Sequence, residues 1–518
     1  MKKSLLTLAL ALLTSLGMSA KDYTGTLVVN VNGTSTRQTA TISVDKNADG
    51  TYNFNLKNFM LKMGEQTMGI GDITLNNLQA ATSSKGDVVA THQNIAITAG
   101  DDPNVSTWMG PMLGTIPLDL KLLVNDEKLY TLIGIDMKML NQKILVTFGD
   151  NYQLPNSGFE DYRTEQISKL NESYQKVTVD VEEPLNWHSF ASATGDYAQA
   201  ANAFSDAHTY SSTVVRQNST SKKSLLLTST SVFGITANGT ITTGRMQAGD
   251  YDAANTKNCA FLSTDSTSTD SHGDPFYALM DGTPDSIAVW VKFKQGTPNA
   301  EHPYATISAA ITDGTYYQDP QDKVYTNVVA TAKNAQIASN NFEWQRIVVP
   351  FKYNDNDVKA KAMLVTISTN ADPGQGSDND NLYVDDISLV YGIEQPALSV
   401  DGKNVELSSS ELTVKTADIN ATISPTTSNH GSFTAMNTIS SDDTQKKVRI
   451  LYCADDLSSV KEYTLTLVKD GTTGINGITD KKDGSAELYN LAGQRINNAQ
   501  PGQVVIVKKG GKAVKVMK

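Results

Sequence analysis

The sequence predicts an all-β protein of several domains, and three observations support this fold class. Apolar and polar residues alternate with a period of two in many segments, as in Leu27, Val29 and Val31, which is typical of half-buried strands. Turn residues such as Asn47-Ala48-Asp49-Gly50 separate these segments. The chain of 518 residues is long enough for several domains of about 100–200 residues each.

Residues 1–20 have the pattern of a secretory signal peptide. Met1-Lys2-Lys3 is positive, residues 5–16 are apolar, and Met18-Ser19-Ala20 supplies small residues before Lys21. The apolar run is shorter than the about 20 residues that a membrane-spanning helix needs. We therefore expect export, and we expect no transmembrane segment here or later in the chain.

Residues 21–150 form the first predicted domain, an antiparallel meander that closes into a barrel and so removes its exposed edges. The segments Asp22-Tyr23-Thr24-Gly25-Thr26-Leu27 and 52–59 carry a family likeness. On these segments the domain resembles the calycin-like (lipocalin-like) barrels of exported Bacteroidetes proteins. Relatives of that kind often hold a small apolar ligand, a property that we do not transfer to this chain.

Residues 151–394 predict a second domain, a two-sheet jelly roll. Ile287, Val289, Val291 and Phe293 share one face of a strand, which places Trp290 on the opposite face. Asn238-Gly239 predicts a hairpin turn between the apolar residues on either side.

The second domain begins Asn156-Ser157-Gly158-Phe159-Glu160 and ends with Leu382-Tyr383-Val384-Asp385-Asp386-Ile387. It resembles jelly-roll carbohydrate-binding modules, and more closely a Bacteroidetes family named for carbohydrate metabolism. The resemblance implies a polysaccharide or glycoconjugate as partner, and it defines no catalytic residue. It also implies a structural calcium between Glu160 and either Asp385 or Asp386, because this ion prefers carboxylate and carbonyl oxygens. The strand period places the two aspartates on opposite faces; alternatively, all three carboxylates only cap strand ends in water.

Aromatic rings that stack on sugar rings are the candidate ligand-binding residues. Trp290 is expected on the surface of its strand, and Trp187, Tyr316 and Tyr317 lie in loop-like sequence where the rims of binding sites form. A glycoside-active enzyme is the alternative, since it would need two converging carboxylates. Its candidates are Glu182, Glu183, Glu343, Asp385 and Asp386.

Residues 395–470 predict a small immunoglobulin-like sandwich, and residues 471–518 a linker followed by a short β domain. Leu488-Tyr489-Asn490-Leu491-Ala492-Gly493 and the strand after Gly502 resemble the C-terminal sorting domains of type IX secretion cargo. That resemblance implies delivery to the cell surface or medium rather than retention in the periplasm. Alternatively, the tail is only a small β domain that packs on its neighbour, and the destination after export is then open.

Charge and cysteine content exclude several function classes. A net charge of -12 argues against a nucleic-acid partner, whose phosphates require a basic face. Cys259 and Cys453 are too few and too distant for a disulfide framework, and no Cys/His cluster suggests zinc. We therefore expect an exported, non-catalytic glycan-associated protein, with a glycoside-active enzyme or a structural or adhesive surface protein as alternatives.

Overall fold

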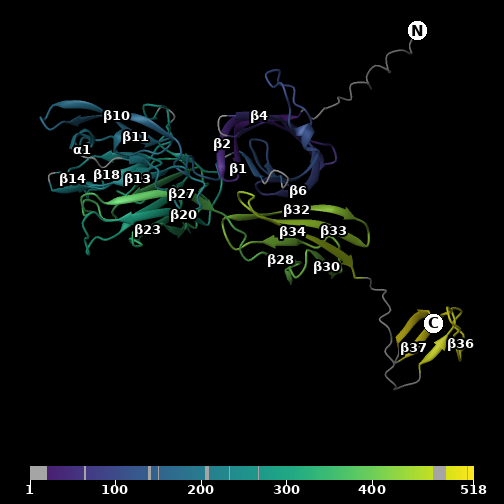
Figure 1. The fold of residues 1–518 in the computed structure, drawn as a ribbon. Helices are drawn as coiled ribbons and strands as arrows, with labels where there is room; N and C mark the ends of the chain where they lie inside the picture. The colour runs from purple at the N-terminus through teal and green to yellow at the C-terminus, as the bar shows by residue number, and fades with distance from the viewer. Residues whose placement is uncertain are drawn as a thin grey trace, which may run out of the picture. The chain divides into compact units, whose positions relative to one another are not determined.

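The computed structural model describes residues 20–63, 66–137, 142–149, 151–204, 209–232, 234–265, 268–470, 486–509 and 512–517. Strands dominate this part of the chain, and its one α-helix is α1 (Ala198–Phe204). The predicted all-β class is confirmed (Figure 1). The predicted signal peptide and most of the linker after residue 470 lie outside the described residues. Within the described ranges, no helix is long and apolar enough to cross a membrane.

The chain divides into two compact units. The first holds the described residues up to Leu412, with Thr422–Ile439 and Val448–Leu465. The second holds Thr413–Ala421, Ser440–Lys447 and the described residues from Thr466 onward. The finer boundaries expected from the sequence remain predictions.

The N-terminal domain is one curled antiparallel sheet in the strand order β5-β6-β7-β8-β9-β1-β2-β3-β4. Figure 1 shows its strands arranged around a ring. An isolated bridge between Asp72 and Thr98 joins β4 to the segment after β6. Alternate residues such as Leu27, Val29 and Phe54 form the interior, as their period of two predicts. The strands are β1 (Lys21–Val31), β2 (Thr34–Lys46), β3 (Tyr52–Met63), β4 (Gln66–Leu78), β5 (Ala80–Ser83), β6 (Gly86–Ala96), β7 (Thr115–Val124), β8 (Leu129–Met137) and β9 (Gln142–Phe148), with a 3-10 turn at Gly110–Leu113.

The central domain is a sandwich of two antiparallel sheets, as predicted. Apolar side chains from both sheets, among them Val289, Ile307 and Val365, fill the space between them. The five-stranded sheet contains, in spatial order, β12 (Thr209–Ser212), β13 (Ser224–Thr228), β27 (Asn381–Val390), β20 (Ser286–Lys294) and β24 (Gln345–Pro350). The opposite sheet contains β16 (Thr240–Thr242), β26 (Ala362–Ser368), β21 (Ala305–Thr312), β23 (Val328–Ile337) and β25 (Lys352–Tyr353), with β19 (Ala278–Leu279) beside β26.

Shorter elements cover parts of this sandwich. A three-stranded sheet packs on the outside of β21 and β26, where Met246, Leu262 and Tyr317 meet Ala310 and Leu364 in a small second core. The covering elements are β17 (Arg245–Ala248), β18 (Asn258–Leu262) and β22 (Tyr317–Asp319), the hairpins β10 (Tyr162–Leu170) with β11 (Lys176–Pro184) and β14 (Thr230–Val232) with β15 (Ile235–Ala237), and a 3-10 turn at Phe190–Ser192.

The hairpin predicted at Asn238-Gly239 is wrong. β15 pairs with β14, whereas β16, which follows this dipeptide, pairs with β26 in the six-stranded sheet. Gly239 instead lets the backbone approach that of Thr228 closely, because a Cβ atom there would lie 2.5 Å from the carbonyl oxygen of Thr228.

The remaining strands follow the sandwich. Residues 397–426 include the three-stranded sheet β29-β28-β31, and four further strands extend to Lys469. A separate four-stranded sheet, β36-β35-β37-β38, lies near the C-terminus. The strands are β28 (Ala397–Val400), β29 (Lys403–Val405), β30 (Glu411–Thr416), β31 (Ile423–Thr426), β32 (Ser432–Ser441), β33 (Gln445–Ala454), β34 (Val460–Lys469), β35 (Glu487–Tyr489), β36 (Arg495–Ile496), β37 (Val504–Lys509) and β38 (Lys512–Met517).

Candidate functional site

A groove of about 250 Å³ lies on the outer face of the six-stranded sheet, beside the three-stranded sheet that covers part of it. Ser308 and Ala310 from β21 and Thr331 from β23 contribute to its floor, because alternate residues of these strands point away from the sandwich core. These side chains are small, so a ligand can approach the strand surface closely. The groove volume is just below the roughly 300–1,000 Å³ of sites for drug-sized ligands, which suits a group of about one sugar ring.

Polar side chains line the groove around this floor. Asp319 at the end of β22 accepts a hydrogen bond of 2.5 Å from the hydroxyl of Ser308. Gln321 and Lys333 also line the groove, and the Gln321 amide donates to the Tyr317 hydroxyl over 3.3 Å. The site thus offers a carboxylate, an amide and an ammonium group, which together can both accept and donate hydrogen bonds to sugar hydroxyls.

Tyr316 and Tyr317 lie on opposite sides of the chain where β22 begins, and of the two only Tyr317 lines this groove. Tyr317 is buried in the groove wall, so the surface position expected for its ring is wrong. Tyr316 is 44% exposed and stacks on Phe261, with 5.6 Å between ring centroids. The ring centroid of Tyr325 lies 6.4 Å from that of Tyr316 and 5.1 Å from that of Tyr317. Burial and nearby acidic groups raise the pKa of Tyr316 to about 12, so its hydroxyl stays protonated at neutral pH and donates to Gln318.

Trp187 does not lie on a binding rim, and this prediction is also wrong. Its side chain is 0% exposed, its indole N–H donates to the carbonyl of Pro155 over 2.9 Å, and its ring packs against Phe159. The loop-like sequence before α1 folds back onto the sandwich core, which needs a large apolar side chain at this point. Trp187 is therefore a core residue.

Trp290 lies on the outer side of β20, as its alternation with Ile287, Val289 and Val291 predicts. The ring is half-buried rather than open, because the guanidinium of Arg216 lies 4.4 Å from its centroid. Arg216 also forms an ion pair with Asp386. Through Arg216, the ring of Trp290 is therefore linked to the carboxylate of Asp386.

Glu160, Asp385 and Asp386 gather around one loop, residues 216–223. The backbone N–H of Lys222 donates to Glu160 over 2.8 Å, and the Ser221 hydroxyl lies 3.3 Å from Asp385 and 3.4 Å from Asp386. Both aspartates thus reach the same hydroxyl, and the expectation that they point to opposite faces is wrong. The register of β27 against β20 shifts here, and Asp386 has a φ of 44°. Such a β-bulge breaks the period of two on which that expectation depended.

The oxygen Oδ2 of Asp385 provides a test of the implied calcium. Asp385 is 0% exposed, and this oxygen has no hydrogen-bond partner within the described residues. Burial, together with the charge of Asp386, raises the pKa of Asp385 to about 7. A buried carboxylate with an unused oxygen is one ligand of the kind that a hard cation takes, but Glu160, Asp385 and Asp386 are not among the described groups of three whose ligand atoms lie within 4.8 Å of one another. Asp386 is less available because Arg216 already neutralises it.

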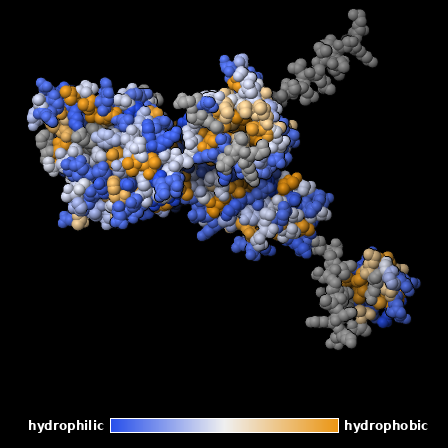
Figure 2. All heavy atoms as spheres, viewed as in Figure 1, coloured by the Kyte–Doolittle hydropathy of each residue, from blue (hydrophilic) through white to orange (hydrophobic). Residues whose placement is uncertain are grey.

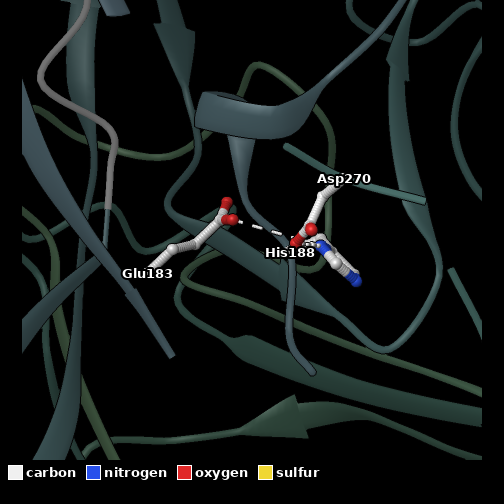
Figure 3. Close-up of side chains that lie close together, drawn as sticks. All are labelled: Glu183, His188 and Asp270. Atoms are coloured by element: carbon white, nitrogen blue, oxygen red, sulfur yellow. Dashed lines mark ion pairs between the residues drawn. The ribbon is translucent and has the colours of Figure 1, made fainter. Parts of the chain in front are cut away.

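A second, largely buried cluster centres on Arg163 at the start of β10. Its guanidinium contacts four carboxylates: Glu165, Glu183, Asp270 and Asp274. Figure 3 shows that the side chains of Glu183, His188 and Asp270 point toward one another, and their ligand atoms lie within 4.8 Å of each other. The sequence did not predict this cluster, because its members come from β10, β11 and two loops that are far apart in the chain.

Hydrogen bonds fix the protonation pattern of this cluster. His188 Nε2 lies 3.1 Å from the carbonyl oxygen of Pro275, so it carries the ring proton, and Nδ1 faces Arg163 at 3.3 Å. Burial lowers the pKa of His188 and keeps its ring neutral. Glu183 accepts from the backbone N–H and the hydroxyl of Ser189, each over 2.6 Å.

A neutral histidine and two carboxylates could hold a divalent metal. Nη2 of Arg163, however, contacts both Glu183 and Asp270 and therefore already supplies the positive charge at their centre. A metal would have to displace a guanidinium that is only 4% exposed. The arrangement is best explained as an ionic core that joins the β10–β11 hairpin to the loop at Asp270.

The carboxylates suggested for glycoside chemistry do not gather in the groove. Glu183 is buried beneath Arg163, and Glu182 accepts hydrogen bonds from Ser211 at the edge of the other sheet. Glu343 is exposed in the turn before β24. Of the residues that line the groove, Asp319 alone carries a carboxylate, whereas glycoside hydrolysis usually needs two.

Comparisons with known proteins bear on the N-terminal domain. Residues 20–151 match the family model of the calycin-like beta-barrel domain, so this part of the chain is a calycin-like domain and the corresponding prediction is confirmed. No curated protein matches the chain. One solved structure, a fructofuranosidase from Schwanniomyces occidentalis complexed with fructose, aligns over 70% of this chain and 78% of that chain, at 7% identity. Its TM-score of 0.10 is too low to carry an argument.

Proposed function

We propose that this protein is an exported glycan-binding protein whose central sandwich binds a sugar in the groove on its six-stranded sheet. The observation that carries the proposal is the groove itself. Its floor of small side chains is lined by Asp319, Gln321 and Lys333, and Tyr317 forms part of its wall. A concave site with a few convergent polar groups is the chemistry that orients a small hydroxylated ligand such as a sugar.

The visible surface of the central sandwich is mostly polar (Figure 2), as a hydroxylated ligand would require. Figure 2 shows apolar residues of the central sandwich in small groups among polar ones on the visible face. A single groove carboxylate favours binding over hydrolysis. Export is the part of the proposal that rests on residues 1–20, whose charge, apolar run and small residues match a signal peptide.

A bound calcium would strengthen the opposite side of the sandwich. Asp385 and Glu160 would hold the ion, and it would neutralise a carboxylate that is otherwise costly to ionise when buried. Its contribution there would be structural, since it would tie the segment at Glu160 to strand β27.

Affinity electrophoresis of the full chain through gels that contain single polysaccharides tests the proposal. The variants are Asp319→Asn in the groove and Tyr174→Ala at the exposed tip of the β10–β11 hairpin, where Tyr174 is 80% exposed. We expect at least one neutral polysaccharide to retard the wild type and Tyr174→Ala but not Asp319→Asn. Equal migration of all three proteins in every gel would reject groove binding, and release of reducing sugar would indicate an enzyme instead.

A further inference from the structure

The outer face of the five-stranded sheet carries a group of aromatic and basic side chains that the groove does not use. This basic aromatic face comprises Lys292, Lys294, Arg346, Phe342, Trp344 and Tyr383. Lys292 and Lys294 alternate with the core residues Val291 and Phe293, so they point outward from β20. The β20–β27 register places Lys292 next to Tyr383.

The rings and the cations of this face are interleaved. The ammonium groups of Lys292 and Lys294 lie 4.5 Å and 4.7 Å from the ring centroid of Phe342. The ring centroid of Tyr383 lies 6.0 Å from that of Phe342 and 6.4 Å from that of Trp344. Two charged residues two positions apart on one strand are separated by about 6.6 Å along it. The face therefore presents a short row of positive charges with flat apolar surface between them.

The charges of this row are not neutralised within the described residues. Neither lysine, nor Arg346, forms an ion pair with a carboxylate there. Asp386, on the same sheet, pairs with Arg216, Asp385 is buried beside Ser221, and Glu343 is the exposed acid nearest in sequence. Because these cations have no carboxylate partner there, they are available to pair with the acidic groups of a ligand.

The backbone of the turn before β24 gives independent support. Asn341 and Phe342 have φ values of 52° and 58°. The left-handed region is unusual for a bulky side chain, and such strain is commonly retained where it positions a functional residue. Here the strained turn places the Phe342 ring beside both lysines.

We propose that the basic aromatic face is a second carbohydrate-binding surface, specific for an acidic polysaccharide that bears carboxylate or sulfate groups. The cations pair with the acidic groups, and the rings contact the apolar faces of the sugars. A nucleic acid fits less well, because duplex DNA carries about one negative charge per 1.7 Å and requires a more extended basic face than three cations provide. The groove lies on the other sheet, so this inference does not depend on sugar binding there.

The test compares the full-length wild type with Lys292→Gln/Lys294→Gln/Arg346→Gln, which removes three charges but little volume. The control is Lys257→Gln/Lys352→Gln/Lys359→Gln, three exposed lysines elsewhere in the central sandwich. The probes are polygalacturonate, chondroitin sulfate, neutral dextran and double-stranded DNA, titrated calorimetrically at low and at high salt. Thermal unfolding of each variant verifies the fold, and Lys294→Gln alone serves if the triple variant does not fold.

We expect the wild type and the control to bind polygalacturonate or chondroitin sulfate, and to bind them more weakly at high salt. Neutral dextran should not bind to this face. The triple variant should bind about tenfold more weakly or worse, since three exposed ion pairs are lost. Tyr174→Ala, at the exposed tip of the β10–β11 hairpin, should leave this binding unchanged. The inference is overturned if neither acidic polysaccharide binds, if the triple variant binds like the control, or if DNA binds more tightly than both.

Discussion

Replacing Asp385 by asparagine removes a buried carboxyl group whose oxygen Oδ2 has no hydrogen-bond partner within the described residues. Its pKa is raised from 3.8 to about 7 by burial and by the charge of Asp386. The folded protein therefore holds a proton that the unfolded chain releases between these two values. Stability from this group is fully present below about pH 4 and is lost as the pH rises through 7.

The magnitude follows from the two pKa values. Between pH 5.5 and pH 8.5 the raised pKa of Asp385 lowers the free energy of unfolding by at most about 2 kcal/mol, and solvent screening reduces this figure. The asparagine side chain of the variant has a similar shape and does not titrate. We therefore expect Asp385→Asn to lose this part of the pH dependence and to be more stable than the wild type at pH 8.5 without metal.

Scanning calorimetry of the full chain with a chelator measures this effect as the midpoint of the central sandwich at both pH values. Glu343→Gln, an exposed acid on the same domain, is the control. Calcium at a hundredfold excess over its dissociation constant should stabilise the wild type by about 2.7 kcal/mol, and should leave Asp385→Asn nearly unchanged. If the variant keeps the wild-type pH dependence, or is less stable than the wild type at pH 8.5, Asp385 does not titrate with a raised pKa in the folded protein.

Three further predictions concern buried groups. Arg163→Met leaves four carboxylates around an apolar side chain and should destabilise the central sandwich by about 3–5 kcal/mol in a calorimetric scan, whereas a small effect would contradict the ionic-core interpretation. Trp187→Ala should cost about 3–5 kcal/mol through the cavity it creates, and correctly folded variant protein should bind glycans unchanged. Burial raises the thiol pKa of Cys259 to about 11, so its modification by a thiol reagent should require denaturant; rapid reaction in buffer would show that the thiol is accessible.

Local alternation predicted much of the fold. The apolar residues of β20 form the core and Trp290 lies on the other face, because a period of two is fixed by the geometry of a strand. The same rule failed at Asp386, where a bulge rotates the chain and brings both aspartates to Ser221. A bulge depends on the partner strand, so the sequence of β27 alone does not reveal it.

The candidate sites were less predictable than the strands. Arg163, Glu183 and Asp270 meet through tertiary contacts between distant segments, and no spacing in the sequence indicates that meeting. Trp187 was expected on a rim because its neighbours resemble a loop, yet burial depends on what packs over a residue. Lys292 and Lys294 illustrate the reverse case, since their outward position follows from alternation but their contact with Phe342 depends on a strained turn.

A calorimetric titration shows whether the groove on the six-stranded sheet binds sugar. A polysaccharide that retards the full chain is titrated into the wild type, Asp319→Asn and Tyr174→Ala. We expect equal affinity for the wild type and Tyr174→Ala, and at least about tenfold weaker binding by Asp319→Asn, because a charged hydrogen-bond acceptor in the groove is lost. Equal affinity of Asp319→Asn and the wild type would show that sugar does not bind in the groove.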